Sequence, residues 1–163
     1  MSRTTLRLGA LIVVGVLLHG AVMPHVAIFG GRINVLVLFV AGTAFLHGTT
    51  TGMLVGLVAG LLADALFTSV FGLSTIPLVV VGYAVGQAER QLFHDEVLVP
   101  AIVGFASVLT FEVLLLLLSR LAFGVWWGGA FVEGFVPSVL VTGALMPLAF
   151  FGLLRLDRVL GRR

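Results

Sequence analysis

Two carboxylates stand inside apolar stretches of this chain, Asp64 and Glu112, and they are the residues best placed to do chemistry. In a membrane such a side chain costs about 2.5–3.5 kcal/mol on insertion scales, so it tends to face a bundle interior or serve a function. Acid–base catalysis would also need a partner group and a substrate cleft. The sequence shows no nucleophile–base pair near either carboxylate, so we assign no catalytic residue and expect no enzymatic activity.

Metal and cofactor chemistry is not indicated by the remaining ligand-type residues. The four histidines, His19, His25, His47 and His94, lack the spacing of a metal motif. The absence of cysteine excludes disulfides, iron–sulfur clusters and thiol chemistry. All nine basic residues are arginines, and they form no basic face interleaved with aromatics. We therefore expect no metal, no cofactor and no nucleic-acid partner.

Composition determines which elements must position these side chains. The chain has 163 residues, of which 60% are hydrophobic and 10% charged, and its mean hydropathy is +1.24. Soluble domains carry about 25% charged residues, and a chain this short cannot bury so much apolar surface. A soluble globular enzyme and a disordered chain are both excluded. We expect an integral membrane protein with a single transmembrane domain over residues 1–163.

Six apolar stretches predict an all-α fold, a compact bundle of six transmembrane helices. A membrane β-barrel would alternate polar and apolar residues, which these unbroken runs do not. A spanning helix needs about 20 residues, and the second and fourth stretches, with 14 each, are short. They either extend into polar flanks or are partly re-entrant. The stretches are Leu8–Phe29, Ile33–Leu46, Thr50–Phe67, Leu73–Gly86, Val97–Ser119 and Phe135–Leu156.

Arginine placement predicts the orientation of the bundle. Six spans put Arg32 and Arg120 on one side and seven arginines on the other. The positive-inside rule then makes both termini cytoplasmic, together with the polar link Gln87–Glu96. The loop between the last two stretches, Arg120–Gly134, would lie outside. The seven are Arg3, Arg7, Arg90, Arg155, Arg158, Arg162 and Arg163.

Small residues repeat along the third stretch. Gly52, Gly56 and Gly60 are four apart, and Asp64 is the next step, so all four share one helix face. Close backbone approach through small residues drives much helix association in lipid. This face either packs inside the bundle or seats a partner helix, and the sequence leaves both open.

Each buried carboxylate needs local hydrogen-bond partners. Asp64 lies near the C-terminal end of its helix, which is unfavourable for the helix dipole. Its nearest donors are backbone N–H groups of Phe71–Thr75, so we expect it to hold that connection. Glu112 is expected to be protonated and bonded to Thr110, His19 or a backbone carbonyl.

Two tryptophans mark the last predicted loop. Trp126 and Trp127 stand among glycines between the fifth and sixth stretches. Tryptophan at a membrane boundary is usually an interfacial anchor. A docking surface for a partner is the alternative.

The residues around Asp64 resemble a known family. Gly60-Leu61-Leu62-Ala63-Asp64, followed by Gly72 and Leu73, resembles the G-L-x-x-D…G pattern of the bacterial rod shape-determining protein MreD family. The chain length, short loops and polar link before the fifth helix also fit. By position, Gly60, Asp64 and Gly72 match the family motif.

The resemblance implies a fold and a function. It implies a six-helix bundle similar to the substrate-binding membrane subunits of vitamin transporters, in the bacterial plasma (inner) membrane. It implies a non-enzymatic scaffold of the elongation machinery that binds MreC, a single-span protein, and contacts membrane lipid. Through MreC it would support the RodA glycosyltransferase, a penicillin-binding transpeptidase and MreB filaments in peptidoglycan synthesis.

Two other functions compete with this one. A transport or small-ligand-binding subunit would use Asp64 and Glu112 in a polar cavity. An intramembrane enzyme acting on lipid-linked substrates would need a catalytic pair that the sequence does not offer.

Overall fold

The computed structural model describes residues 13, 15–17, 19–20, 27–28, 31–68, 70–89, 98–124 and 129–159. Residues 13, 15–17 and 19–20 are helical. Among the described residues, three helices contain segments long and apolar enough to cross a membrane, at Thr49–Phe67, Ile102–Phe123 and Gly134–Leu153. The helices are α2 (Val35–His47), α3 (Thr49–Phe67), α4 (Thr75–Glu89), α5 (Leu98–Phe123) and α6 (Gly129–Val159). The chain is thus a helical membrane protein, and the second and fourth apolar stretches give short helices, as predicted.

The first predicted helix does not extend to Phe29. Residues Ala27–Ile28 form β1, which pairs antiparallel with β2, Gly31–Arg32. The prediction of an unbroken helix over Leu8–Phe29 was wrong at this end. Glycine is a poor helix former, and the adjacent pair at positions 30 and 31 favours a turn over a continued helix.

α2 starts at a side-chain cap and is tied there to α6. The Asn34 carboxamide oxygen accepts the backbone N–H of Val37 at 3.2 Å, as an N-cap residue does. The backbone N–H of Asn34 donates to the hydroxyl of Thr142 in α6 at 3.1 Å. At its other end, α2 is joined to α3 through Gly48 alone, whose φ of +82° suits glycine.

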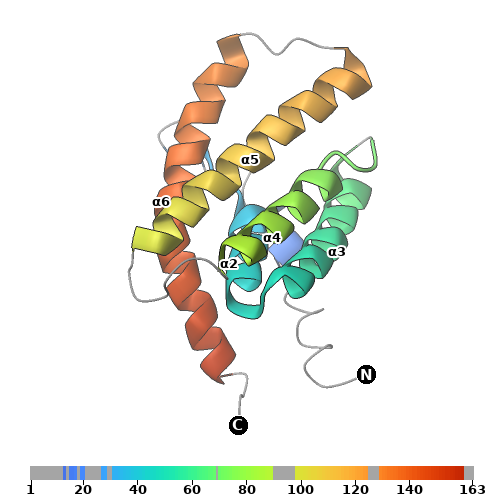
Figure 1. Cartoon of the computed structure of the whole chain (residues 1–163). Helices are drawn as coiled ribbons and strands as arrows, with labels where there is room; N and C mark the ends of the chain where they lie inside the picture. The colour runs from blue at the N-terminus through green and yellow to red at the C-terminus, as the bar shows by residue number, and fades with distance from the viewer. Residues whose placement is uncertain are drawn as a thin grey trace.

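α4 is the central helix of the bundle (Figure 1). It packs against α3, α2 and α5, while α6 lies beyond α5 and contacts α5, α2 and β2. Its inward residues Leu78, Val81 and Val85 are buried. They join buried residues of the neighbouring helices in one core: Val37, Val40, Ala41, Ala44, Val55, Ala59, Ala63, Val103, Val108, Phe111 and Met146.

The distribution of large and small residues on α3 is the one expected in lipid. The buried face of α3 consists mainly of glycine and alanine, together with Val55 and Asp64. Its exposed face carries large apolar side chains, including Leu54, Leu57 and Leu61. Lipid tails accommodate leucine as well as a protein core does, so small residues can be kept for close helix contact.

The connections differ in length from those predicted. α4 continues through Glu89, so the link Gln87–Glu96 begins as helix. α5 continues past Arg120 to Phe123, because Leu121, Ala122 and Phe123 extend its apolar run. Gly124, with a φ of +63°, then ends α5 and donates its N–H to the Arg120 carbonyl at 2.9 Å. The predicted outer loop from Arg120 to Gly134 is correspondingly shorter.

Candidate functional site

The carboxylate of Asp64 lies at the junction of α3 and α4 and is fully buried. Oδ2 accepts the backbone N–H of Gly72 at 2.9 Å and that of Thr75 at 3.1 Å, together with the Thr75 hydroxyl at 2.6 Å. Oδ1 accepts the N–H of Ser74 at 2.8 Å and the hydroxyl of Thr68 at 3.1 Å. Five donors thus converge on one side chain. Four of them belong to the segment Phe71–Thr75, and three of these four are backbone N–H groups, as the sequence predicts.

These contacts place Asp64 at the N-terminus of α4. The first N–H groups of a helix have no partner within it and carry the positive end of its dipole. Asp64 bonds the N–H of Ser74 and Thr75, just where α4 begins. Its unfavourable position at the end of α3 is therefore offset by a favourable one at the start of α4. Pro77, the third residue of α4, has no N–H that would need such a partner.

The connection itself has the conformation that this bonding needs. Thr68 ends α3, and its single hydroxyl hydrogen is shared between Oδ1 and the backbone carbonyl oxygen of Asp64, which lies 2.9 Å from the hydroxyl oxygen. Gly72 has a φ of +99°, in the region that glycine occupies readily and other residues rarely do. The Gly72 carbonyl then accepts the N–H of Ile76 at 3.1 Å, which leads the chain into α4. The eight-residue spacing between Asp64 and Gly72 thus allows the chain to turn back so that the backbone from Gly72 onward reaches the Asp64 carboxylate.

The glycine face of α3 lies directly against the backbone of α4. A Cβ added to Gly56 would stand 2.5 Å from the Leu78 carbonyl oxygen. A Cβ on Gly60 would meet the backbone of Thr75, 3.0 Å from its nitrogen. Real Cβ atoms do not approach that closely, so these positions admit only glycine without movement of a helix. Within the part of the chain that the structure describes, the glycine face of α3 therefore packs against α4 inside the bundle.

α4 contributes glycines of its own to this contact. A Cβ on Gly52 would lie 2.7 Å from the Gly82 carbonyl oxygen, and one on Gly82 would meet the Gly52 backbone. Gly86 faces the backbone of Thr49 in the same way. The sequence analysis missed Gly82 and Gly86. Their own four-residue spacing was the available signal.

The glycine contact and the Asp64 bonding form one unit. Gly60 allows the Thr75 backbone to come close to α3, and one helical turn later Asp64 accepts the Thr75 N–H and hydroxyl. Because every contact is donated to Asp64, the arrangement suits an acceptor-only carboxylate. Chemically, this unit fixes two helices against each other. We call it the Asp64 turn: Gly60, Asp64, Thr68, Gly72, Ser74 and Thr75.

The second carboxylate, Glu112, is separate from this unit. It is half-buried on α5, and α3 and α5 share at most a marginal contact among the described residues. Thr110, a predicted partner, donates instead to the Ala106 carbonyl at 2.7 Å. Nδ1 of His19, on the other predicted partner, is buried and bonds to none of the described residues. The structure does not bring the two carboxylates into one polar site.

The remaining predicted site residues are not placed. Trp126 and Trp127 lie outside the described residues, as does His25. Within the described ranges, no three histidine, aspartate or glutamate side chains gather in a way that could hold a metal ion.

Comparison with known proteins gives one result that covers nearly the whole chain. The family described as rod shape-determining protein MreD matches residues 2–156. The match includes both helices of the Asp64 turn and the whole of α5. No curated protein sequence matches.

Proposed function

The chain belongs to the MreD family, and from this premise we propose that it is a non-enzymatic membrane scaffold of the cell-elongation machinery. Its family takes part in determining rod shape. The proposed role is to hold an MreC-like single-span protein in the membrane. Through that partner it would support RodA, a penicillin-binding transpeptidase and MreB filaments during peptidoglycan synthesis.

The single observation that carries this proposal is the family match over residues 2–156. It reaches every described helix, ending three residues before the end of α6, and it contains Gly60, Asp64 and Gly72. In the structure these three residues belong to one packing unit. A family motif that fixes helix geometry suits a protein whose task is to present a surface.

The chemistry of the two carboxylates also supports a scaffold. Both oxygens of Asp64 already accept hydrogen bonds from neighbouring groups, which leaves this side chain committed to structure. Glu112 has no acid–base partner among the described residues. General acid–base catalysis needs such a partner in hydrogen-bond reach of a substrate.

The membrane arrangement is part of the proposal. Three long apolar helices and the family support a membrane protein. We extend this to one domain of six spans in the bacterial inner membrane, with both termini cytoplasmic because seven of nine arginines then face inward. The likeness to substrate-binding subunits of vitamin transporters belongs to the same extension. In this orientation the Asp64 turn faces the outside of the cell.

Co-purification tests the proposal. The tagged chain is expressed with the MreC protein of the same genome and extracted in a mild detergent. We expect the two to elute together at a fixed ratio on size exclusion. A matched control replaces MreC by an unrelated single-span protein of equal length. Separate elution of MreC and the chain, as for the control, would refute the partner assignment.

A further inference from the structure

The outer part of α5, from Glu112 onward, and residues 134–137 of α6 pack less closely than the rest of these two helices. A Cβ on Gly143 would lie 2.6 Å from the Phe105 ring, and Gly104 is equally close to Met146, so the helices touch there. Beyond Phe111, by contrast, no described residue of α5 is buried. On α6 the same holds for residues 134–137. Figure 1 shows the two helices crossing near the start of α5 and diverging toward its end.

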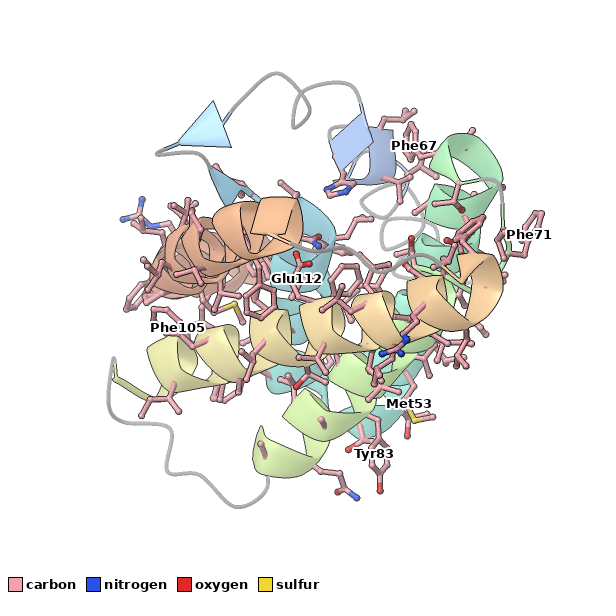
Figure 2. All side chains as sticks on the ribbon, turned by 90° about the horizontal axis from the view of Figure 1, so that it is seen from above. Met53, Phe67, Phe71, Tyr83, Phe105 and Glu112 are labelled. Carbon is pink, nitrogen blue, oxygen red and sulfur yellow. The ribbon has the colours of Figure 1, made fainter. Side chains whose placement is uncertain are left out.

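Glu112 stands where this divergence begins. Figure 2 shows its side chain directed from α5 toward α6, between the two helices. It is the eleventh residue of the 22-residue candidate span Ile102–Phe123, so it lies near mid-membrane. None of the described residues donates a hydrogen bond to it. Arg120 is eight positions further on, about 12 Å along the axis.

We propose that the outer part of α5 from Glu112 onward and residues 134–137 of α6 seat one apolar helix of a different protein, which presents a hydrogen-bond donor at the depth of Glu112. This inference rests on the proposed scaffold function and names the surface that it would use. The surface is defined by Glu112 and Ser119 of α5 and by Gly134, Val136 and Pro137 of α6.

The polarity of Glu112 selects this occupant. The hydrocarbon tails of lipids have no donor, so lipid alone leaves the carboxyl group unsatisfied at a real cost in free energy. A second copy of this chain, packed through the same surface, would satisfy the two carboxyl groups only by pairing them with each other, and the cross-linking assay below identifies that occupant. A spanning helix with a serine, threonine, asparagine, glutamine or basic side chain supplies the missing donor. Polar side chains join membrane helices in this way.

Cysteine cross-linking locates the occupant, and the cysteine-free chain makes the assay clean. Ser119 lies two helical turns after Glu112 on the same line of α5, whereas Leu117 is 54% exposed on another face. Each is changed to cysteine and paired with single cysteines along the span of the MreC protein of the same genome. We expect Ser119→Cys to cross-link to MreC positions three or four apart. Leu117→Cys, the matched control, should remain at background.

Substitutions of Glu112 measure how much the hydrogen bond from the partner's donor contributes to MreC binding. Glu112→Gln keeps an acceptor oxygen, while Glu112→Leu removes it. We expect Glu112→Leu to weaken MreC binding about threefold, the mean strength of a hydrogen bond between membrane helices. Glu112→Gln should bind like the unmodified chain. Size exclusion reports whether each variant folds. If Glu112→Leu misfolds, Glu112→Gln alone tests the proposed hydrogen bond, because a loss of MreC binding by Glu112→Gln would contradict the inference.

Each remaining outcome separates this inference from the proposed function. Cross-links from Ser119→Cys only to a second copy would overturn the inference, as would none at all while MreC still co-purifies. Both results leave the scaffold function intact. Failure of MreC to co-purify with the unmodified chain would overturn the scaffold function, and this inference with it.

Discussion

Replacing Asp64 by leucine removes both acceptor oxygens from three backbone N–H groups, those of Gly72, Ser74 and Thr75. A buried donor left without a partner costs about 1–3 kcal/mol. For three such groups the loss in free energy of unfolding is about 3–9 kcal/mol if none of them finds another partner. The loss is smaller wherever water reaches the turn. Total stabilities are of the order of 5–15 kcal/mol. Asp64→Leu should therefore cause a large loss of thermal stability in detergent.

Asparagine at this position separates the hydrogen bonds from the charge. Asp64→Asn keeps one acceptor oxygen, which can replace Oδ2 and serve Gly72 and Thr75. Its NH₂ group then faces the Ser74 N–H, another donor. One unsatisfied N–H predicts a loss of about 1–3 kcal/mol. The Thr68 hydroxyl can rotate to accept, so it adds little.

The assay is the midpoint of thermal unfolding, followed by fluorescence-detected size exclusion. Ala65→Leu is the matched control, because Ala65 is exposed and adjacent on α3. We expect the unfolding midpoint to be highest for Ala65→Leu, lower for Asp64→Asn and lowest for Asp64→Leu. Equal midpoints for Asp64→Leu and Ala65→Leu would refute the structural role. Normal folding of Asp64→Asn with loss of rod shape would instead favour the transport alternative.

Three further predictions concern packing, the turn and topology. Gly56→Leu should separate α3 from α4 and lower the unfolding midpoint strongly, whereas Met53→Leu on the exposed face should not; equal midpoints would contradict the contact. Gly72→Ala should cost about 1–2 kcal/mol because its φ is +99°, and an unchanged midpoint would exclude that conformation. An impermeant thiol reagent added to intact cells should label Phe71→Cys but not Arg155→Cys, both exposed positions; the reverse pattern would invert the orientation.

The backbone donors of Asp64 could be predicted because a buried carboxylate must accept hydrogen bonds, and few donors lie within its reach. A carboxylate at the end of an apolar helix must find nearby donors, and the connection Phe71–Thr75 was the nearest source. The hydroxyls of Thr68 and Thr75 were not foreseen. For Thr68, the four-residue spacing from Asp64, one helical turn, was the available signal.

The neighbour of the glycine face could not be predicted. The spacing of Gly52, Gly56 and Gly60 says that a backbone comes close, but a repeat on one helix does not name the other. Only the structure identifies α4, through the close approach of Leu78, Thr75 and Gly82 to the glycines of α3. The strand pair at residues 27–32 was missed for a different reason. Two-residue strands carry no periodicity, and the surrounding apolar run masks them.

The central claim is that this chain supports rod shape as a scaffold, without chemistry by its membrane carboxylates. The most direct test is cell shape in a strain depleted of its own copy and supplied with the double variant Asp64→Asn, Glu112→Gln. Neither substituted side chain can titrate, yet both keep an acceptor oxygen. At a temperature at which the variant is folded and bound to MreC, the account predicts rods of normal width. Round cells containing a folded, MreC-bound variant would contradict it.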